Sequence, residues 1–192
     1  ATKVGVSRGV AKTLVLAMSY GAGPEKVAQT LRLNGHPVSQ AQSRTYLYDL
    51  QREFKVYFNW RERIIADSKR TGYVKTLDGR LRRLNSKDNS LRAAWKDPSA
   101  PGRQAANAVV QGSAADIVRR VMLHTSKMFP ELRLLAQVHD ELVWEYDPAT
   151  YTPPLDRLEQ WVLKIAERGL TVPLVFKPHQ GSSWYRAKEG IV

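Results

Sequence analysis

Near the start of the sequence, two cationic side chains, an aliphatic one and an aromatic one recur at every fourth position: Arg8, Lys12, Leu16 and Tyr20. Steps of four advance by only about 40 degrees around an α-helix, so a helix would carry all four on one face. Such a face suits a triphosphate, because arginine forms paired hydrogen bonds to phosphate oxygens, lysine adds a compact charge, and an aromatic ring can meet a base. By itself the row is also typical of a solvated basic face with a buried tyrosine.

A second row with the same spacing consists of long polar side chains, Arg103, Asn107 and Gln111, and is followed by small residues over 112–115. Donors of this length suit the minor groove of DNA, where every base pair presents acceptors in nearly the same places. The row therefore favours a protein that accepts any base sequence over one that recognises a particular sequence. Taken alone, it is also typical of an exposed amphipathic helix that packs through its small residues.

Two adjacent carboxylates, Asp140 and Glu141, lie between two apolar runs, 132–138 and 142–146. Acidic residues on a rigid turn suit Mg²⁺, which prefers hard oxygen ligands and accepts few of them from protein. The sequence has no cysteine, so any metal must be bound by oxygen or imidazole. An isolated acidic turn is most often just solvated, so this assignment depends on the motifs that accompany it.

Helical and strand patterns place each of these groups on a defined element. Ser7 is suited to cap the first helix, and Gly21 with Gly23 to end it. Asp78-Gly79 predicts a hairpin turn, and the apolar runs around the acidic pair predict a second hairpin. Helices are predicted over 7–20, 24–33, 39–69, 102–128 and 153–168, hairpins over 71–80 and 132–146, an exposed loop around a short helical piece over 85–102, and a strand over 172–176.

Composition restricts the class of protein. The chain has 192 residues, of which 43% are hydrophobic, enough for one domain with a substantial core. Its formal net charge of +12 indicates a polyanionic partner, and nucleic acid is the first candidate, although ribosomal and membrane-surface proteins share such a charge. No apolar run reaches the length of a membrane span, and the first residues lack the layout of a secretory signal, so we expect a soluble intracellular protein without a membrane partner.

The three groups occur in the order found in family A (polymerase I-like) DNA polymerases, and the sequence resembles that family over almost its whole length. The usual motif B of the family, on its fingers helix, reads Arg-x3-Lys-x3-Phe-x3-Tyr-Gly. The similar segments are 8–21 (motif B), 71–76 with Gly79-Arg80 (the stretch after the fingers helices), 103–116 (the minor-groove helix), 137–141 (Gln-Val-His-Asp-Glu, motif C) and Gly181-x2-Trp184 (the C-terminus).

The resemblance implies an α/β fold. A helical fingers subdomain over 1–100 would be inserted before the C-terminal part of an antiparallel palm sheet with flanking helices, over 101–192. It also implies DNA-directed DNA polymerase activity, the transfer of nucleotides from dNTPs to a primer 3′-hydroxyl, with primer-template DNA as partner and two Mg²⁺ ions as cofactors. Catalysis of this kind depends mainly on positioning and charge neutralisation.

The resemblance further assigns roles to single residues. Asp140 would bind metal, Glu141 would support the primer terminus or the metal shell, and His139 would contact the primer backbone. Arg8 and Lys12 would neutralise triphosphate oxygens, and Lys12 is a candidate proton donor to the departing pyrophosphate.

The same resemblance places Tyr20 and the adjacent Gly21 at the template base, and uses the row of long polar side chains after residue 102 to check base-pair shape. Leu16 stands where the family usually has Phe or Tyr against the deoxyribose, which leaves sugar selectivity open. Non-aromatic residues occur at this position among viral members. A phage origin, and the cytoplasm of a bacterium or an infected host cell, are therefore expected.

Motif A of the family, an Asp-Tyr-Ser-x-Ile-Glu-Leu-Arg-like strand before motif B, is not found in residues 1–192. That strand supplies another metal-binding Asp and the Glu that excludes ribonucleotides. We therefore expect the chain to be inactive alone and to need a second polypeptide with motif A, the thumb and any exonuclease domain. A split polymerase, an interrupted gene and a truncated sequence each explain the absence; a split fits best.

Two other functions stay open. A non-catalytic nucleic-acid-binding subunit would retain these groups only as contacts, but binding alone needs no metal carboxylate such as Asp140. A fragment of a single-subunit phage-type RNA polymerase would share the Arg, Lys and Tyr-Gly of motif B, but its motif C typically reads His-Asp-Ser, so Glu141 favours DNA synthesis. A palm sheet completed by a partner predicts an exposed sheet edge on this chain.

Overall fold

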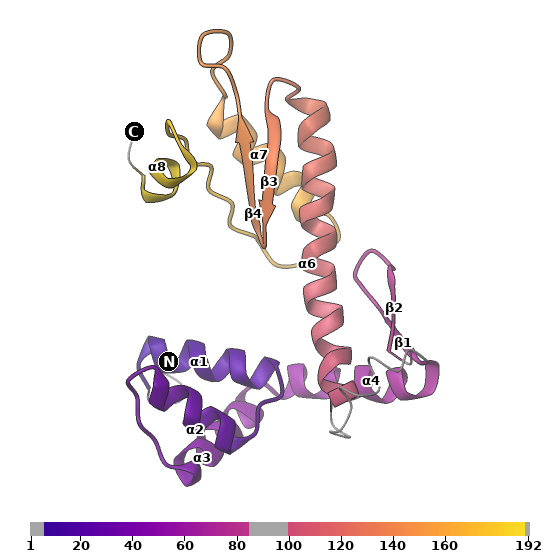
Figure 1. Ribbon diagram of the computed structural model, residues 1–192. Helices are drawn as coiled ribbons and strands as arrows, with labels where there is room; N and C mark the ends of the chain where they lie inside the picture. The colour runs from indigo at the N-terminus through magenta and orange to yellow at the C-terminus, as the bar shows by residue number, and fades with distance from the viewer. Residues whose placement is uncertain (1–5, 85–99, 191–192) are drawn as a thin grey trace, which may run out of the picture. The chain divides into compact units, whose positions relative to one another are not determined.

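The computed structural model describes residues 6–84 and 100–190 and divides into two compact units, Ala1–Val110 and Gln111–Val192. We call them the N-terminal and the C-terminal unit and describe each by itself (Figure 1). Helices and antiparallel hairpins make up both, which confirms the predicted α/β class. No helix within the described ranges is long and apolar enough to cross a membrane.

Four helices begin the N-terminal unit, and their apolar faces form its main core. Leu14 and Leu31 are fully buried in this core, and Leu50 is nearly so. Ser7 caps the first helix, as predicted, by accepting a hydrogen bond from the backbone N–H of Val10, and Ser39 forms a capping box with Gln42 on the third. The helices are α1 (Arg8–Ser19), α2 (Pro24–Leu33), α3 (Gln40–Glu53) and α4 (Lys55–Thr71).

The prediction of one continuous helix over 39–69 is wrong, because the helix breaks at Phe54, where φ is −107° and ψ is 42°. No glycine or proline marks the break. On the α3 side Leu50 packs into the core formed with α1 and α2, whereas Ile64 of α4 packs against a different cluster around Val74. Tyr57 and Phe58, in the first turn of α4, still pack against the first core, so the change from one core to the other occurs within α4 and not at Phe54.

A short hairpin completes the described part of the N-terminal unit and confirms the prediction from Asp78-Gly79. Strands β1 (Tyr73–Lys75) and β2 (Leu81–Arg83) pair in antiparallel fashion. Gly79 adopts a positive φ of 80°, and the Thr76 side chain accepts a hydrogen bond from the Arg80 backbone N–H. Apolar side chains of the hairpin pack on buried alanines at the start of α6.

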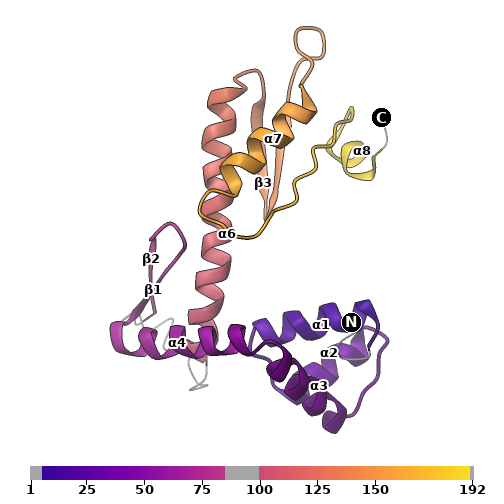
Figure 2. The ribbon, with the colours of Figure 1, turned by 180° about the vertical axis from the view of Figure 1, so that it is seen from behind.

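The C-terminal unit consists of a helix–hairpin–helix core and a C-terminal tail. Helix α7 lies against one face of the β3–β4 hairpin, behind it in Figure 1 and in front of it in Figure 2. Val121, Phe129 and Leu158 are among the buried residues that join these elements. The predicted helices and hairpin are thus confirmed as α6 (Ala100–Met128), β3 (Arg133–Val138), β4 (Glu141–Glu145) and α7 (Leu155–Ala166), and α8 (Trp184–Glu189) is an element that sequence patterns missed.

The predicted strand over 172–176 is wrong. Its backbone pairs with no strand within the described residues. Pro173 has no N–H to donate, the Leu174 N–H donates to the Glu167 carboxylate at 2.7 Å, and Val175 is 85% exposed. An apolar segment becomes a strand only when a neighbouring strand accepts and donates its backbone hydrogen bonds. Here the Leu174 N–H instead donates to the carboxylate of Glu167, just after the end of α7. Most of the loop predicted over 85–102, residues 85–99, lies outside the described residues. Its last three residues belong to α6, which begins at Ala100.

Candidate active site

Helix α1 presents the row of Arg8, Lys12, Leu16 and Tyr20 on its exposed face. Leu16 is 48% and Tyr20 49% exposed, so the alternative of a buried tyrosine does not hold. The opposite stripe of α1, which includes Leu14, is buried in the helical core and thereby fixes which side faces out. The structure thus brings all four predicted side chains to one accessible helix face.

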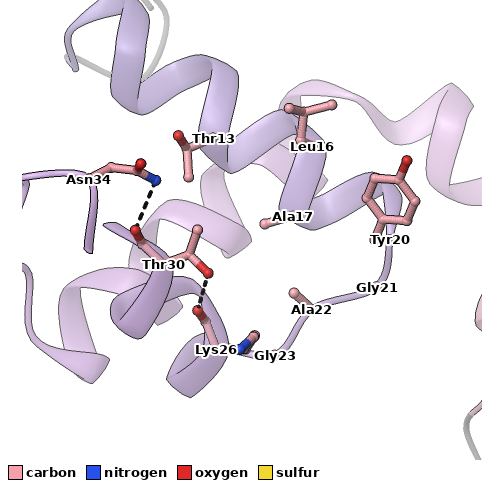
Figure 3. A pocket seen from close by; sticks show the side chains of 10 residues that line it. All are labelled: Thr13, Leu16, Ala17, Tyr20, Gly21, Ala22, Gly23, Lys26, Thr30 and Asn34. Atoms are coloured by element: carbon pink, nitrogen blue, oxygen red, sulfur yellow. Dashed lines mark hydrogen bonds between the residues drawn. The ribbon is translucent and has the colours of Figure 1, made fainter. Parts of the chain in front are cut away.

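A hollow of about 650 Å³ opens beside this face, between α1 and α2 (Figure 3). Leu16, Ala17 and Tyr20 border it from α1, and Thr30 borders it from α2. Thr30 donates its hydroxyl hydrogen bond back to the carbonyl of Lys26 on its own helix. The walls are therefore mainly apolar, and the Thr30 hydroxyl already has a hydrogen-bond partner within its own helix. Such a lining suits a flat, weakly polar group such as a base. Gly21, with φ of 68°, turns the chain from α1 toward α2.

The polar row after residue 102 lies on α6. Asn107 is half-buried and Gln111 is exposed, while Ala105 and Ala108 of the same helix are buried. The side chain of Arg103 lies outside what the structure describes. Directly after the small residues, Asp116 is 5% exposed and lies 3.5 Å from the Arg119 guanidinium. The alanines permit close packing on one side of α6. The long polar side chains of Asn107 and Gln111 lie on the other, more exposed side.

The β3–β4 hairpin carries the acidic pair at its tip. Val138 pairs with Glu141 across the strands, so His139 and Asp140 form a two-residue turn. His139 adopts a positive φ of 57°, which is uncommon for residues other than glycine, and its carbonyl accepts a hydrogen bond from the Gln137 side chain at 3.2 Å. The turn fixes the backbone under Asp140, whose side chain is exposed.

Glu141 is held by the C-terminal tail. Its Oε1 accepts a hydrogen bond from the Trp184 indole N–H at 2.5 Å, and its Oε2 lies 3.5 Å from the Lys188 ammonium. The Trp184 hydrogen bond, with a smaller contribution from Lys188, lowers the pKa of Glu141, against the opposing effects of desolvation and of the Asp140 charge. Two neighbouring carboxylates therefore have different surroundings.

Metal-ligating residues are sparse: the described ranges hold no group of three or more His, Asp or Glu that could bind a metal ion. The hairpin tip still fits Mg²⁺ in part, because this ion keeps several waters and takes one or two carboxylates together with phosphate oxygens. Asp140 is the exposed carboxylate of the turn and can supply one such ligand. Phosphate oxygens or a further carboxylate would have to supply the remaining ligands.

Sequence reasoning missed the contacts made by Trp184 and Lys188. Gly181-x2-Trp184 matches a family pattern that indicates no role for Trp184. Two features in the sequence indicate a short helix with both side chains on one face: Trp184 and Lys188 are four residues apart, and Ser183 before them is a typical helix cap. The partner, 43 residues earlier in the chain, is not readable from local spacing.

Comparisons with known proteins identify the family to which the chain belongs. The family model described as DNA polymerase family A matches residues 4–186. DNA polymerase I of Synechocystis sp. is 31% identical over 201 residues, covering 94% of this chain and 19% of that protein. Thermostable DNA polymerase I of Thermus aquaticus is 34% identical over 190 residues, covering 95% of this chain and 21% of that protein.

Among solved structures, the POL domain of Pol1 from M. smegmatis, in complex with DNA primer-template and dNTP, superposes with a TM-score of 0.72 at 27% identity. The match covers 94% of this chain and 31% of that one. The chain spans about a fifth of the length of the two curated relatives. By its family match and its coverage by these relatives, the chain belongs to DNA polymerase family A.

Proposed function

We propose that this chain is the fingers and C-terminal palm part of a DNA-directed DNA polymerase, which adds nucleotides from dNTPs to a primer 3′-hydroxyl. The remaining parts, motif A and the thumb, would come from another segment, on the same polypeptide or on a second chain. The observation that carries the proposal is Asp140, an exposed carboxylate on a rigid turn of a chain with a net charge of +12. A protein that only binds nucleic acid gains nothing from a carboxylate facing phosphates.

The exposed face of α1 supports a role in binding the incoming nucleotide. Arg8 and Lys12 lie where they can neutralise triphosphate oxygens, and Lys12 can donate a proton to the departing pyrophosphate. Tyr20, at the end of the row, borders the hollow between α1 and α2, which is large enough for a base. We assign these residues to the dNTP and the template base, with Leu16 beside the sugar.

The two motifs of the C-terminal half would act on the primer-template. Asn107 and Gln111, with Arg103, would donate hydrogen bonds to the minor-groove acceptors that all base pairs share. His139 would contact the primer backbone beside Asp140, which would bind Mg²⁺. The two Mg²⁺ ions that we propose would neutralise phosphate charge and lower the pKa of the primer hydroxyl.

The proposal is tested with Asp140→Ala in the polymerase assembly that contains this chain. Incorporation of a single dNTP should fall at least 100-fold, about 3 kcal/mol of transition-state stabilisation, because a metal ligand is lost. Primer-template affinity should change by less than about threefold, since charge and groove contacts supply it.

Asp156→Ala is the matched control, because it removes another exposed carboxylate of the same unit, on α7. It should leave both quantities unchanged. Equal loss of incorporation and of DNA affinity in Asp140→Ala would contradict the metal assignment and favour a binding subunit.

A further inference from the structure

The C-terminal tail has a closely fixed local structure. Ser183 caps α8 by accepting a hydrogen bond from the Arg186 N–H, and Gly190, with φ of 69°, ends the helix. A Cβ on Gly181 would lie 2.7 Å from the backbone nitrogen of Ala187, too close for any side chain. The tail therefore folds back tightly on itself before α8, and glycine is required there.

Two side chains of α8 reach the same carboxylate. Trp184 and Lys188 are one helical turn apart, and they contact the two different oxygens of Glu141, at 2.5 Å and 3.5 Å. The Lys188 ammonium also lies 6.0 Å from the centre of the Trp184 ring. Contacts to both oxygens restrict rotation of the carboxylate and keep it on the side of α8.

We propose that Trp184 and Lys188 are positioning residues: they hold the Glu141 carboxylate on α8, so that Asp140 is the carboxylate of this turn that binds the divalent cation. This inference rests on the proposed function, because it takes Asp140 as the metal ligand. Without α8, two adjacent carboxylates would be available to one ion. Mg²⁺ tolerates such crowding poorly, whereas larger cations such as Ca²⁺ accept more oxygen ligands.

The contact itself is measured by NMR of the indole N–H groups of the purified chain, with Trp184→Phe to assign the Trp184 signal. An indole N–H bonded to a carboxylate resonates downfield, so Glu141→Gln should shift the Trp184 signal upfield and leave the other indole signals in place. A Trp184 signal that does not move would overturn the proposed contact. This measurement needs neither metal nor activity.

The effect on metal binding is measured by titrating the chain with Mn²⁺, followed by electron paramagnetic resonance. Trp184→Phe combined with Lys188→Gln should raise Mn²⁺ affinity at least threefold, because Glu141 becomes available, and adding Glu141→Gln should remove the gain. Lys188→Arg should retain the original affinity. Unchanged Mn²⁺ affinity in the double variant would overturn the positioning role.

Tyr185→Phe is the control for general damage to α8, because Tyr185 is 71% exposed and should give the original values in both measurements. Failure of the proposed function is recognised separately. If Asp140→Ala does not weaken Mn²⁺ binding while the indole shift is seen, the contact stands and the metal assignment falls. If Asp140→Ala weakens Mn²⁺ binding but the indole signal does not move, the reverse holds.

In the polymerase assembly, a positioning role predicts a specific kinetic result. Trp184→Phe should lower kcat for single-nucleotide incorporation about tenfold and leave the KM for dNTP within twofold, because nucleotide binding belongs to α1. Loss expressed only as a higher KM would contradict the proposal.

Discussion

At the scale of single residues, Leu16 is the side chain that, in the proposed site, would contact the sugar of an incoming nucleotide. Its side chain is 48% exposed, on the same face as Lys12 and at the edge of the hollow beside Tyr20. A leucine side chain offers contact area but no hydrogen bond. It can therefore select for the shape of a sugar but cannot distinguish which hydroxyl groups the sugar carries. Discrimination against dideoxynucleotides would then depend on other groups.

Leu16→Tyr is expected to increase the use of dideoxynucleotides relative to dNTPs about five- to tenfold. The phenolic hydroxyl can replace one neutral hydrogen bond that a missing 3′-hydroxyl leaves unmade, worth about 1 kcal/mol. Competitive incorporation by the polymerase assembly measures the ratio, and Leu16→Phe, which adds the ring without the hydroxyl, is the control. A ratio unchanged in both variants would remove Leu16 from the sugar site.

At the scale of elements, the cationic face of α1 depends on the buried face behind it. Leu14 is fully buried against α2 and α3, whereas its neighbour Val15 is 39% exposed. The burial of Leu14 determines the rotation of the helix and so the direction in which Arg8 and Lys12 point. Nucleotide binding by α1, as we propose it, would therefore depend on a residue that does not touch the nucleotide.

Leu14→Ala should lower the free energy of unfolding by about 3 kcal/mol, because it removes apolar contacts and leaves a cavity. Val15→Ala, a similar truncation one residue away, should cost less than about 1 kcal/mol. Urea denaturation of the purified chain, followed by circular dichroism, compares the two. Equal losses would show that the buried side of α1 is not the one described.

Helices and strands whose apolar residues recur at regular spacing could be predicted from the sequence. Features that depend on contacts with residues far away in the sequence could not. The helix at Arg8 and the hairpin around Asp140 follow from local spacing and turn chemistry. The break at Phe54 has no glycine or proline to signal it, and the extended run at Val175 has no strand to pair with among the described residues. The link from Glu141 to α8 joins residues 43 apart in sequence, which no local pattern encodes.

At the scale of the whole chain, 30 lysines and arginines face 18 acidic residues. Such an excess would strengthen DNA binding through release of counterions, and would contribute little to the choice of base sequence. In the proposed polymerase, affinity for primer-template and catalytic competence would thus be separable properties. The first would be spread over many cations, whereas the second would depend on a few groups such as Asp140.

Primer-template affinity should therefore decline steeply with salt. If about five phosphates are contacted, the slope of log K against log salt concentration should be near −4.5. Fluorescence anisotropy from 50 to 200 mM salt measures it, and Asp140→Ala should leave the slope unchanged. A slope near zero would exclude a mainly electrostatic mode of binding.

The positive φ of His139 means that a substitution which stabilises the fold at this position would weaken the activity that we propose. Glycine adopts such a conformation at no steric cost, so replacing the imidazole would relieve local strain in the turn. His139→Gly would also remove the side chain that we place at the primer, and it would make the backbone beside Asp140 more flexible. Selection for heat resistance alone would favour glycine here at the cost of the activity that we propose, so stabilising substitutions should be sought away from this turn.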